Sequence, residues 1–291
     1  MERTVGIVGA SGWLGSQLSA ALSKLGWQVV GFSRSAREDD SVKWRQWDGT
    51  GEPDLSGLDA VVNLAGEPID QRWTDSRKKA FFESRVTLSN NLSRAIKGTP
   101  VKVLLNASAV GFYGDRGDDP LPESEPAGSG YLADLCLKWE TAVDTMSDVR
   151  VCYLRTGVVL GKGGRAWEKL SKIFKLGIGG RLGDGRQWMP WIHLDDEIGA
   201  IIHCLENKVQ GPVNLAAPGC VTNQEFTKAL GRAFHRPTLF PAPAFMLKIL
   251  LGEFAEEGLL ASMRVVPAKL EDSGYQFRYP DLESAFAELT S

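Results

Sequence analysis

The sequence predicts an α/β fold, in which a doubly wound parallel Rossmann-type sheet is followed by a smaller, mostly helical C-terminal lobe. Three observations support this prediction. An apolar strand runs directly into a glycine turn and a helix at the N-terminus, strand-like and helix-like runs alternate as far as Lys162, and the composition changes after that residue. Alternating strands and helices of this kind build a parallel sheet with right-handed crossovers.

The stretch G-I-V-G-A-S-G-W-L-G predicts a strand over Val5–Val8, a glycine turn and a helix from Trp13 to about Leu25. In such a turn the first glycine permits the tight bend, the second lets the backbone approach a pyrophosphate, and the third lets helix and strand pack closely. The helix N-terminus offers free N–H groups to phosphate. The predicted dinucleotide contacts of this turn are Gly9, Ser11, Gly12, Trp13, Leu14 and Gly15.

The second predicted strand, Gln28–Phe32, ends in Ser33 and Arg34. In a doubly wound sheet this strand end faces the adenosine ribose, where an acidic side chain would bind the 2′-hydroxyl of NAD. A serine and an arginine suit the 2′-phosphate of NADP instead. The competing interpretation of Arg34 is a solvated loop residue. Because the acid is missing and a cation is present, the sequence favours NADP.

The third and fourth strands are expected at Val42–Trp47 and Leu58–Leu64. Asp48, directly after the third strand, is a candidate contact to the adenine edge. The run N-L-A-G-E follows the fourth strand, and its small residues would let the chain pass close to the cofactor, although an ordinary strand-end turn has the same composition. The predicted contacts here are Leu64, Ala65 and Gly66.

A long amphipathic helix is expected from about Thr74 to Lys97, with Arg85 placed to reach the cofactor or the substrate. The fifth strand, Val101–Asn106, leads into A-S-A-V-G-F-Y-G-D, which contains Ser108 and Tyr113. A further helix is expected from Gly130 to about Met146. The sixth strand, Val149–Leu154, precedes R-T-G-V-V-L-G, which supplies two more predicted cofactor contacts, Val158 and Val159.

After Lys162 the chain becomes rich in glycine, and we expect a lid or substrate-side segment, lined by Trp188 and Trp191, rather than more core sheet. The expected domains are an NADP-binding domain over residues 1–162, with return segments from about 186–220, and a lid and C-terminal substrate-side lobe over residues 163–291. A helix is predicted at Thr222–Phe234, and the mostly helical tail includes one predicted strand near Tyr275–Tyr279.

Composition limits the function. The 291 residues are 43% hydrophobic and 24% charged, with a net charge of −3, which suits a soluble protein and argues against a nucleic-acid partner. The four cysteines are scattered and the three histidines are dispersed, so we expect reduced thiols and no metal site. The most apolar late stretch is too short to span a bilayer. We expect a cytoplasmic protein. The lumen of an organelle is the alternative location if a transit peptide has been removed.

These motifs together resemble the extended short-chain dehydrogenase/reductase superfamily, in its nucleotide-sugar epimerase-like branch. The glycine turn, N-L-A-G, S-A-V-G-F-Y-G and W-I-H-L-D-D carry the resemblance. The tail, with G-E-F-A, L-L-A-S-M-R-V-V-P-A-K-L and G-Y-Q-F-R-Y-P, looks like the C-terminal domain of the atypical subfamily that includes the epimerase family protein of animals. This resemblance implies NADP binding without a settled substrate.

The chain departs from the superfamily at its catalytic pair. Members use Tyr-x-x-x-Lys on one helix face, often with Glu four residues beyond the Lys, and the Lys lowers the pKa of the Tyr. When Glu140 is aligned with that Glu, Leu132 and Cys136 occupy the Tyr and Lys positions. The resemblance leaves Ser108 and Tyr113 as candidate catalytic residues. The alternatives are that Ser108 caps its own turn and that Tyr113 packs over the nicotinamide side. His193 is expected to be structural.

Two functions remain open at this point. The first is an NADP-dependent oxidoreductase or epimerase-like enzyme that has a non-standard acid/base group and an unidentified small-molecule substrate. The second is a catalytically silent NADP-binding sensor or scaffold, with a link to cell division or to an organelle. The intact phosphate turn favours the enzyme, whereas the missing Tyr/Lys pair favours the sensor. The sequence is compatible with either a monomer or a homodimer.

Overall fold

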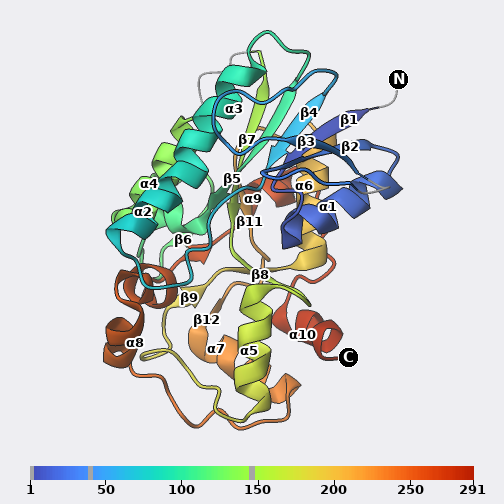
Figure 1. Ribbon diagram of the computed structural model, residues 1–291. Coiled ribbons are helices and arrows are strands. Elements are labelled where there is room, and N and C mark those ends of the chain that lie inside the picture. Colours follow the sequence, from blue (N-terminus) through green and yellow to red (C-terminus); the bar gives the residue numbers. More distant parts are fainter. Residues whose placement is uncertain (1–2, 39–41, 144–147) are drawn as a thin grey trace.

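A seven-stranded parallel sheet forms the centre of the computed structural model, which describes residues 3–38, 42–143 and 148–291 (Figure 1). Every strand pair in the sheet is parallel. Helices cover both faces of the sheet, so the predicted doubly wound fold is confirmed. In spatial order the strands are β11 (Gly211–Leu215), β7 (Arg150–Thr156), β5 (Val103–Ala109), β4 (Ala60–Asn63), β1 (Thr4–Val8), β2 (Gln28–Ser33) and β3 (Lys43–Gln46).

Apolar side chains on alternate sides of these strands bury two layers of helices. On one face, α1 (Trp13–Lys24) and α6 (Leu194–Glu206) pack against the sheet through residues such as Leu18 and Ile201. On the other face, α3 (Leu88–Ile96) packs through Leu92. All six strands expected in the central sheet are present, and β11 adds a seventh at the edge next to β7.

The helix expected from Thr74 to Lys97 is continuous but not uniform. It comprises α2 (Asp75–Phe82), one π-helical turn η1 (Glu83–Thr87) and α3. The hydroxyl of Thr74 caps α2 by accepting a bond from the Arg77 amide (3.3 Å). Helix α4 (Tyr131–Thr141) begins as expected, and its predicted end near Met146 lies outside the described residues.

The lobe below the sheet has its own apolar centre, in which Trp167, Trp191, Phe226 and Phe286 are buried together. Three of its helices surround this centre, α5 (Arg165–Lys175), α7 (Asn223–Ala233) and α10 (Leu282–Thr290). The remaining elements are η2 (Val110–Tyr113), β6 (Pro120–Leu121), β8 (Val158–Leu160), β9 (Trp188–Met189), β10 (Trp191–His193), β12 (Val221–Thr222), α8 (Ala244–Leu251), η3 (Ala255–Leu260), β13 (Arg264–Val265) and α9 (Ala268–Asp272).

The expectation of a lid or substrate-side segment lined by Trp188 and Trp191 was wrong for Trp191. Trp191 is fully buried in β10, which pairs with β8, so it is a core residue and lines no lid. The chain then enters α6, which packs on the central sheet. Trp188 is half-buried, and its indole N–H donates to the carboxylate of Asp118 (2.8 Å).

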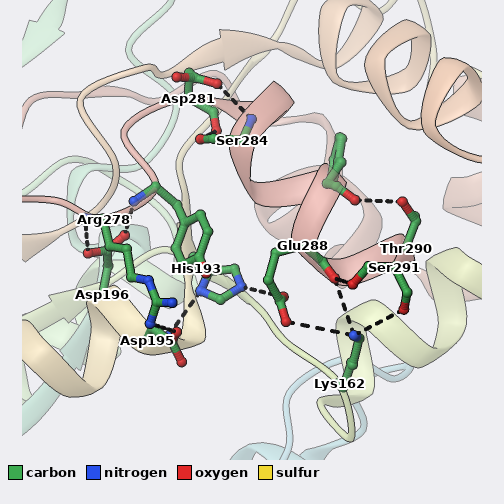
Figure 2. Close-up of polar contacts among 12 residues, drawn as sticks. Lys162, His193, Asp195, Asp196, Arg278, Asp281, Ser284, Glu288, Thr290 and Ser291 are labelled. Carbon is green, nitrogen blue, oxygen red and sulfur yellow. Dashed lines mark hydrogen bonds and ion pairs between the residues drawn. The ribbon is translucent and has the colours of Figure 1, made fainter.

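The strand expected at Tyr275–Tyr279 is absent, because a buried carboxylate binds the amides of this segment. Asp196 Oδ1 accepts from the Arg278 amide and Asp196 Oδ2 from the Tyr279 amide, both at 2.8 Å (Figure 2). The Tyr275 hydroxyl lies 3.1 Å from the same Oδ1. Backbone groups held by a side chain in this way cannot form a strand ladder.

His193 is structural, as expected. Its Nδ1 accepts from the Asp195 amide (3.1 Å) and caps α6, while its Nε2 lies 3.1 Å from Glu288 Oε2 on α10 (Figure 2). The ring is 3% exposed and packs against the ring of Tyr279. Lys162 reaches the end of α10 through the Glu288 carbonyl (3.2 Å), so the C-terminal helix is fastened to both β10 and the start of the lobe.

Candidate functional site

The glycine turn lies where the direction of strand addition reverses. The chain builds β1, β2 and β3 toward one edge and then returns to place β4 on the other side of β1. Gly9, directly after β1, has φ +84°, and a Cβ there would lie 3.1 Å from the Ala65 amide nitrogen after β4. Open α/β sheets bind ligands at the carboxyl ends of the strands at such a point.

Helix α1 approaches this turn as closely as glycine allows. A Cβ at Gly15 would lie 2.1 Å from the Gly9 carbonyl oxygen, so no other residue fits without moving the helix. Gly12 is the N-cap, and the first helical bond runs from the Ser16 amide to the Gly12 carbonyl (2.9 Å). The amides of residues 13–15 therefore lie at the open end of the helix, and the first turn carries no acidic residue.

Trp13 joins this turn to the lobe. Its indole packs so closely on Gly161 and Gly164 that a Cβ at these positions would lie 2.9 Å and 2.4 Å from the ring. The indole N–H also donates to the Lys162 carbonyl (3.2 Å). The predicted contacts Val158 and Val159 lie half-buried in β8, at the same junction between sheet and lobe, and their place beside a cofactor stays a prediction.

The end of β2 presents a cation to solvent. The Arg34 side chain is 82% exposed, and its guanidinium lies 4.0 Å from Glu67, an ion pair at the outer limit of contact. Ser33 is buried. Asp48, after β3, is exposed and accepts from both the amide and the hydroxyl of Thr50 (2.8 and 2.6 Å), and these bonds, the hydroxyl's first, lower the pKa of its carboxyl.

The segment after β4 meets Arg85 of the π-helical turn. Arg85 donates to the Glu67 carbonyl (2.9 Å) and lies 5.0 Å above the ring of Trp139. A Cβ at Gly66 would lie 3.1 Å from the guanidinium. Arg85 thus packs directly against the N-L-A-G-E segment and is held by protein groups, and its reach to a cofactor or substrate stays a prediction.

Ser108 and Tyr113 belong to one buried polar network that includes an ion pair. Glu140 of α4 receives two parallel bonds from Arg155 at the end of β7, each 2.9 Å. The Ser108 hydroxyl donates to Glu140 Oε1 (2.7 Å), because an ionised carboxylate only accepts. The Tyr113 hydroxyl accepts from Arg155 (3.0 Å). The bidentate geometry compensates for burying two charges.

Tyr113 has no exposed surface, and its hydroxyl proton is already donated in a hydrogen bond within the protein. The Asn214 amide group donates to two backbone carbonyls, so its Oδ1 is an acceptor and the Tyr113 hydroxyl donates to it (2.7 Å). Burial raises the pKa of Tyr113, against the opposing effect of Arg155. This geometry favours a structural role for Tyr113, whereas Ser108 keeps lone pairs that are free to accept.

The two helix positions that correspond to the family's Tyr and Lys are both apolar and buried. Leu132 and Cys136 are 7% and 3% exposed. Burial raises the pKa of the Cys136 thiol to about 12, so this cysteine is protonated and unsuited to nucleophilic attack. Tyr131, one residue out of register, donates to the Lys78 carbonyl (3.2 Å).

Sequence reasoning missed two carboxylates. Glu257 of η3 caps α4 by accepting from the amides of Tyr131 (3.1 Å) and Leu132 (2.8 Å), which ties the tail to the sheet domain. Glu197 of α6 is 1% exposed, and burial raises its pKa to about 8. The run D-D-E after His193 signalled a helix start, but nothing local distinguishes the buried third acid from its neighbours.

A glycine turn at the switch point of a doubly wound sheet, with an acid-free helix N-terminus above it, defines the Rossmann class of nucleotide-binding folds. The family profile described as "NAD dependent epimerase/dehydratase family" matches residues 5–216. The chain belongs to this family. A second profile, described as "Domain of unknown function (DUF1731)", matches residues 242–289.

The relatives cover nearly the whole chain. An epimerase family protein of Mycobacterium tuberculosis is 42% identical over 293 residues, which is 99% of this chain and 97% of the relative. The human epimerase family protein SDR39U1 is 33% identical over 97% of this chain and 98% of its own. A crystal structure of human SDR39U1 with NADPH superposes with a TM-score of 0.92 at 32% identity, covering 99% of both chains. The resemblance to the atypical epimerase subfamily is thereby confirmed.

Among the described residues, no helix is both long and apolar enough to cross a membrane.

Proposed function

We propose that this chain binds NADP across the carboxyl edge of its sheet and acts as an oxidoreductase or epimerase-like enzyme with a non-standard acid/base group. The observation that supports the proposal most strongly is the close packing of the glycine turn, at the point where the strand order reverses. A Cβ at Gly15 would lie 2.1 Å from the Gly9 carbonyl oxygen. A close approach of this kind serves a phosphate group bound at the helix N-terminus. The NADPH in the human relative's structure supports the same cofactor.

Each part of the proposed site has a distinct role. The backbone from Gly9 to Gly15 holds the pyrophosphate, and Ser33 and Arg34 hold the 2′-phosphate, because Arg34 is exposed and only weakly paired. Leu64, Ala65, Gly66, Val158 and Val159 flank the cofactor, Arg85 supports this flank, and Asp48 lies toward the adenine. NADP, when bound, supplies a nicotinamide that accepts or donates hydride.

Ser108 is the proposed substrate-positioning group of this site. Since it donates its proton to Glu140, its oxygen is left to accept from a substrate hydroxyl. We assign dinucleotide binding to residues 1–162 with the return segments 186–220, and the substrate side to residues 163–291. The proposed substrate is an alcohol or carbonyl compound held between these two parts.

A silent NADP-binding sensor is the second candidate, favoured by the burial of Leu132 and Cys136 and by the locked hydroxyl of Tyr113. Hydride transfer separates the two candidates. Turnover of any member of a panel of carbonyl and hydroxyl compounds, followed by the absorbance of the reduced nicotinamide, supports the enzyme. Tight NADP binding without turnover across the panel supports the sensor.

The cofactor assignment is tested by calorimetric titration with NADPH, NADP, NADH and NAD. We expect the phosphorylated pair to bind preferentially, and Arg34→Ala to weaken its binding by roughly 1–3 kcal/mol while barely changing the affinity for NAD. Lys24→Ala, an exposed cation at the far end of α1, is the matched control. Equal losses of affinity for NADP and NAD would show that Arg34 does not contact the 2′-phosphate.

A further inference from the structure

The exposed apolar side chains are concentrated in two segments of the lobe. Of the described residues, twelve large apolar side chains are exposed, and nine of them lie in the two segments 173–178 and 239–250. We call these nine residues the apolar end of the lobe. They are Ile173, Leu176, Ile178, Leu239, Phe240, Phe245, Met246, Ile249 and Leu250.

Backbone contacts join the chain after the first segment to the second segment. The Ala242 amide donates to the Arg181 carbonyl (2.8 Å), and the Gly183 amide donates to the Ala242 carbonyl (2.9 Å). A Cβ at Gly180 would lie 1.8 Å from the Phe240 carbonyl oxygen. Figure 1 shows this strip of chain passing below α5, at the end of the lobe far from the central sheet, and then reaching α8, which lies at the side of the lobe beneath α2.

Helix α8 presents apolar side chains to solvent. None of its eight residues is buried, and Phe245, Met246, Ile249 and Leu250 are 48–66% exposed. Their spacing places them on one side of the helix. The opposite side packs inward, where Leu251 meets the buried cluster around Trp73. An outward apolar stripe next to further exposed apolar residues marks an interaction surface.

The same part of the lobe is positively charged. Residues 165–186 and 224–248 carry ten Lys and Arg against three Asp and Glu, whereas the whole chain carries 33 against 36. Three of the ten cations are paired with acids outside these ranges, Arg165 and Lys169 with Asp70 and Lys248 with Glu256, and the other cations keep the excess positive. The rest of the molecule is therefore acidic. An open hollow of about 660 Å³ lies in this region and is lined by Lys228, Arg232, His235 and Arg236. Arg236 adjoins the apolar end directly, since it donates to the Lys175 carbonyl (3.1 Å).

We propose that the apolar end of the lobe docks on the surface of an anionic phospholipid bilayer. Exposed apolar side chains beside lysines and arginines are the combination that binds such a surface, the apolar groups entering the headgroup boundary and the cations meeting the lipid phosphates. Helix α8 has eight residues, so the contact is peripheral. A second copy of the chain fits less well, because a two-fold contact would bring the same basic residues face to face.

Vesicle sedimentation of the full-length protein tests this proposal. We expect binding to vesicles of phosphatidylcholine with phosphatidylglycerol, much weaker binding to phosphatidylcholine alone, and loss of binding in high salt. Phe245→Ser with Ile249→Ser should weaken binding roughly ten-fold or more, through lost apolar contact. Lys172→Glu with Arg232→Glu should weaken it by a similar factor on anionic vesicles.

Matched controls lie elsewhere on the surface. Leu25→Ser removes an exposed apolar side chain at the end of α1, and Lys97→Glu reverses an exposed charge after α3, and both should bind like the parent. Circular dichroism checks that every variant folds. Absence of vesicle binding, or equal binding to neutral vesicles, would overturn the proposal. Dimerisation abolished by the α8 pair, without vesicle binding, would assign the surface to a second copy instead.

Discussion

Glu197 provides the sharpest test of the interior of the sheet domain. Its carboxyl lies in the first turn of α6 with 1% of the residue exposed, and Oε1 accepts from the Thr156 hydroxyl (3.0 Å). Within the described residues, Oε2 is buried without a hydrogen-bond partner. Burial raises the pKa of this carboxyl to about 8, with Thr156 opposing the rise. We expect Glu197→Gln to remove a pH dependence from the stability of the fold.

The sign follows from proton binding. Between pH 4.5, the ordinary pKa of the group, and pH 8, the folded chain keeps the Glu197 proton whereas the unfolded chain has lost it. Stability therefore falls as pH rises through this window, by about 1.4 kcal/mol per pH unit. Over the whole window, protonation of Glu197 contributes roughly 4–5 kcal/mol to the free energy of unfolding. This contribution is fully present below pH 4.5 and is lost above pH 8.

The measurement is urea unfolding followed by tryptophan fluorescence at several pH values across this window. As pH rises, the free energy of unfolding of the parent should fall relative to that of Glu197→Gln, by several kcal/mol in total. Glu271→Gln, which alters an exposed carboxyl of α9, is the matched control and should follow the parent. Parallel profiles for Glu197→Gln and the parent would refute the reasoning, because they would mean that Glu197 is ionised in the folded state.

Two further predictions concern the buried network. Glu140→Gln should lower the free energy of unfolding by roughly 3–5 kcal/mol, because it leaves the Arg155 guanidinium buried without its counter-charge, and denaturant unfolding measures this loss. Tyr113→Phe should cost roughly 1–3 kcal/mol of stability, since Arg155 and Asn214 each lose a partner, while NADPH affinity by calorimetry stays unchanged. Unchanged stability in either variant would contradict this account of the network.

Local patterns predicted the sheet because each strand carries its own signal. Apolar runs bounded by turn residues located the six strands, and glycine spacing located the turn at Gly9–Gly15, where the closest contact, between Gly15 and the Gly9 carbonyl, lies within the same strand–turn–helix unit. These features depend on neighbours within about 20 residues, which periodicity and turn chemistry describe well.

The errors came from long-range polar contacts. Asp196 captures amides more than 80 residues further along the chain, which removes the expected strand at Tyr275–Tyr279. Glu257 caps α4 across 125 residues, and Trp191 is buried by a lobe whose core draws on three distant helices. No local pattern distinguishes a carboxylate that will be buried from one that stays in solvent, because the partner is decided by the tertiary fold.

The buried network also limits what chemistry the site can perform. In the superfamily's pattern a lysine lowers the pKa of the catalytic tyrosine, whereas here the cation next to Tyr113 is Arg155, already bound by both oxygens of Glu140. Burial outweighs that cation, so Tyr113 stays protonated at neutral pH and cannot serve as a base. Of the two predicted catalytic side chains, Tyr113 already accepts from Arg155 and donates to Asn214, whereas Ser108 only donates, to Glu140. An acceptor without a proton to give positions a hydroxyl rather than ionising it. Any proton transfer must therefore involve a group outside this pair, and the substrate screen should include compounds that carry their own acid or base.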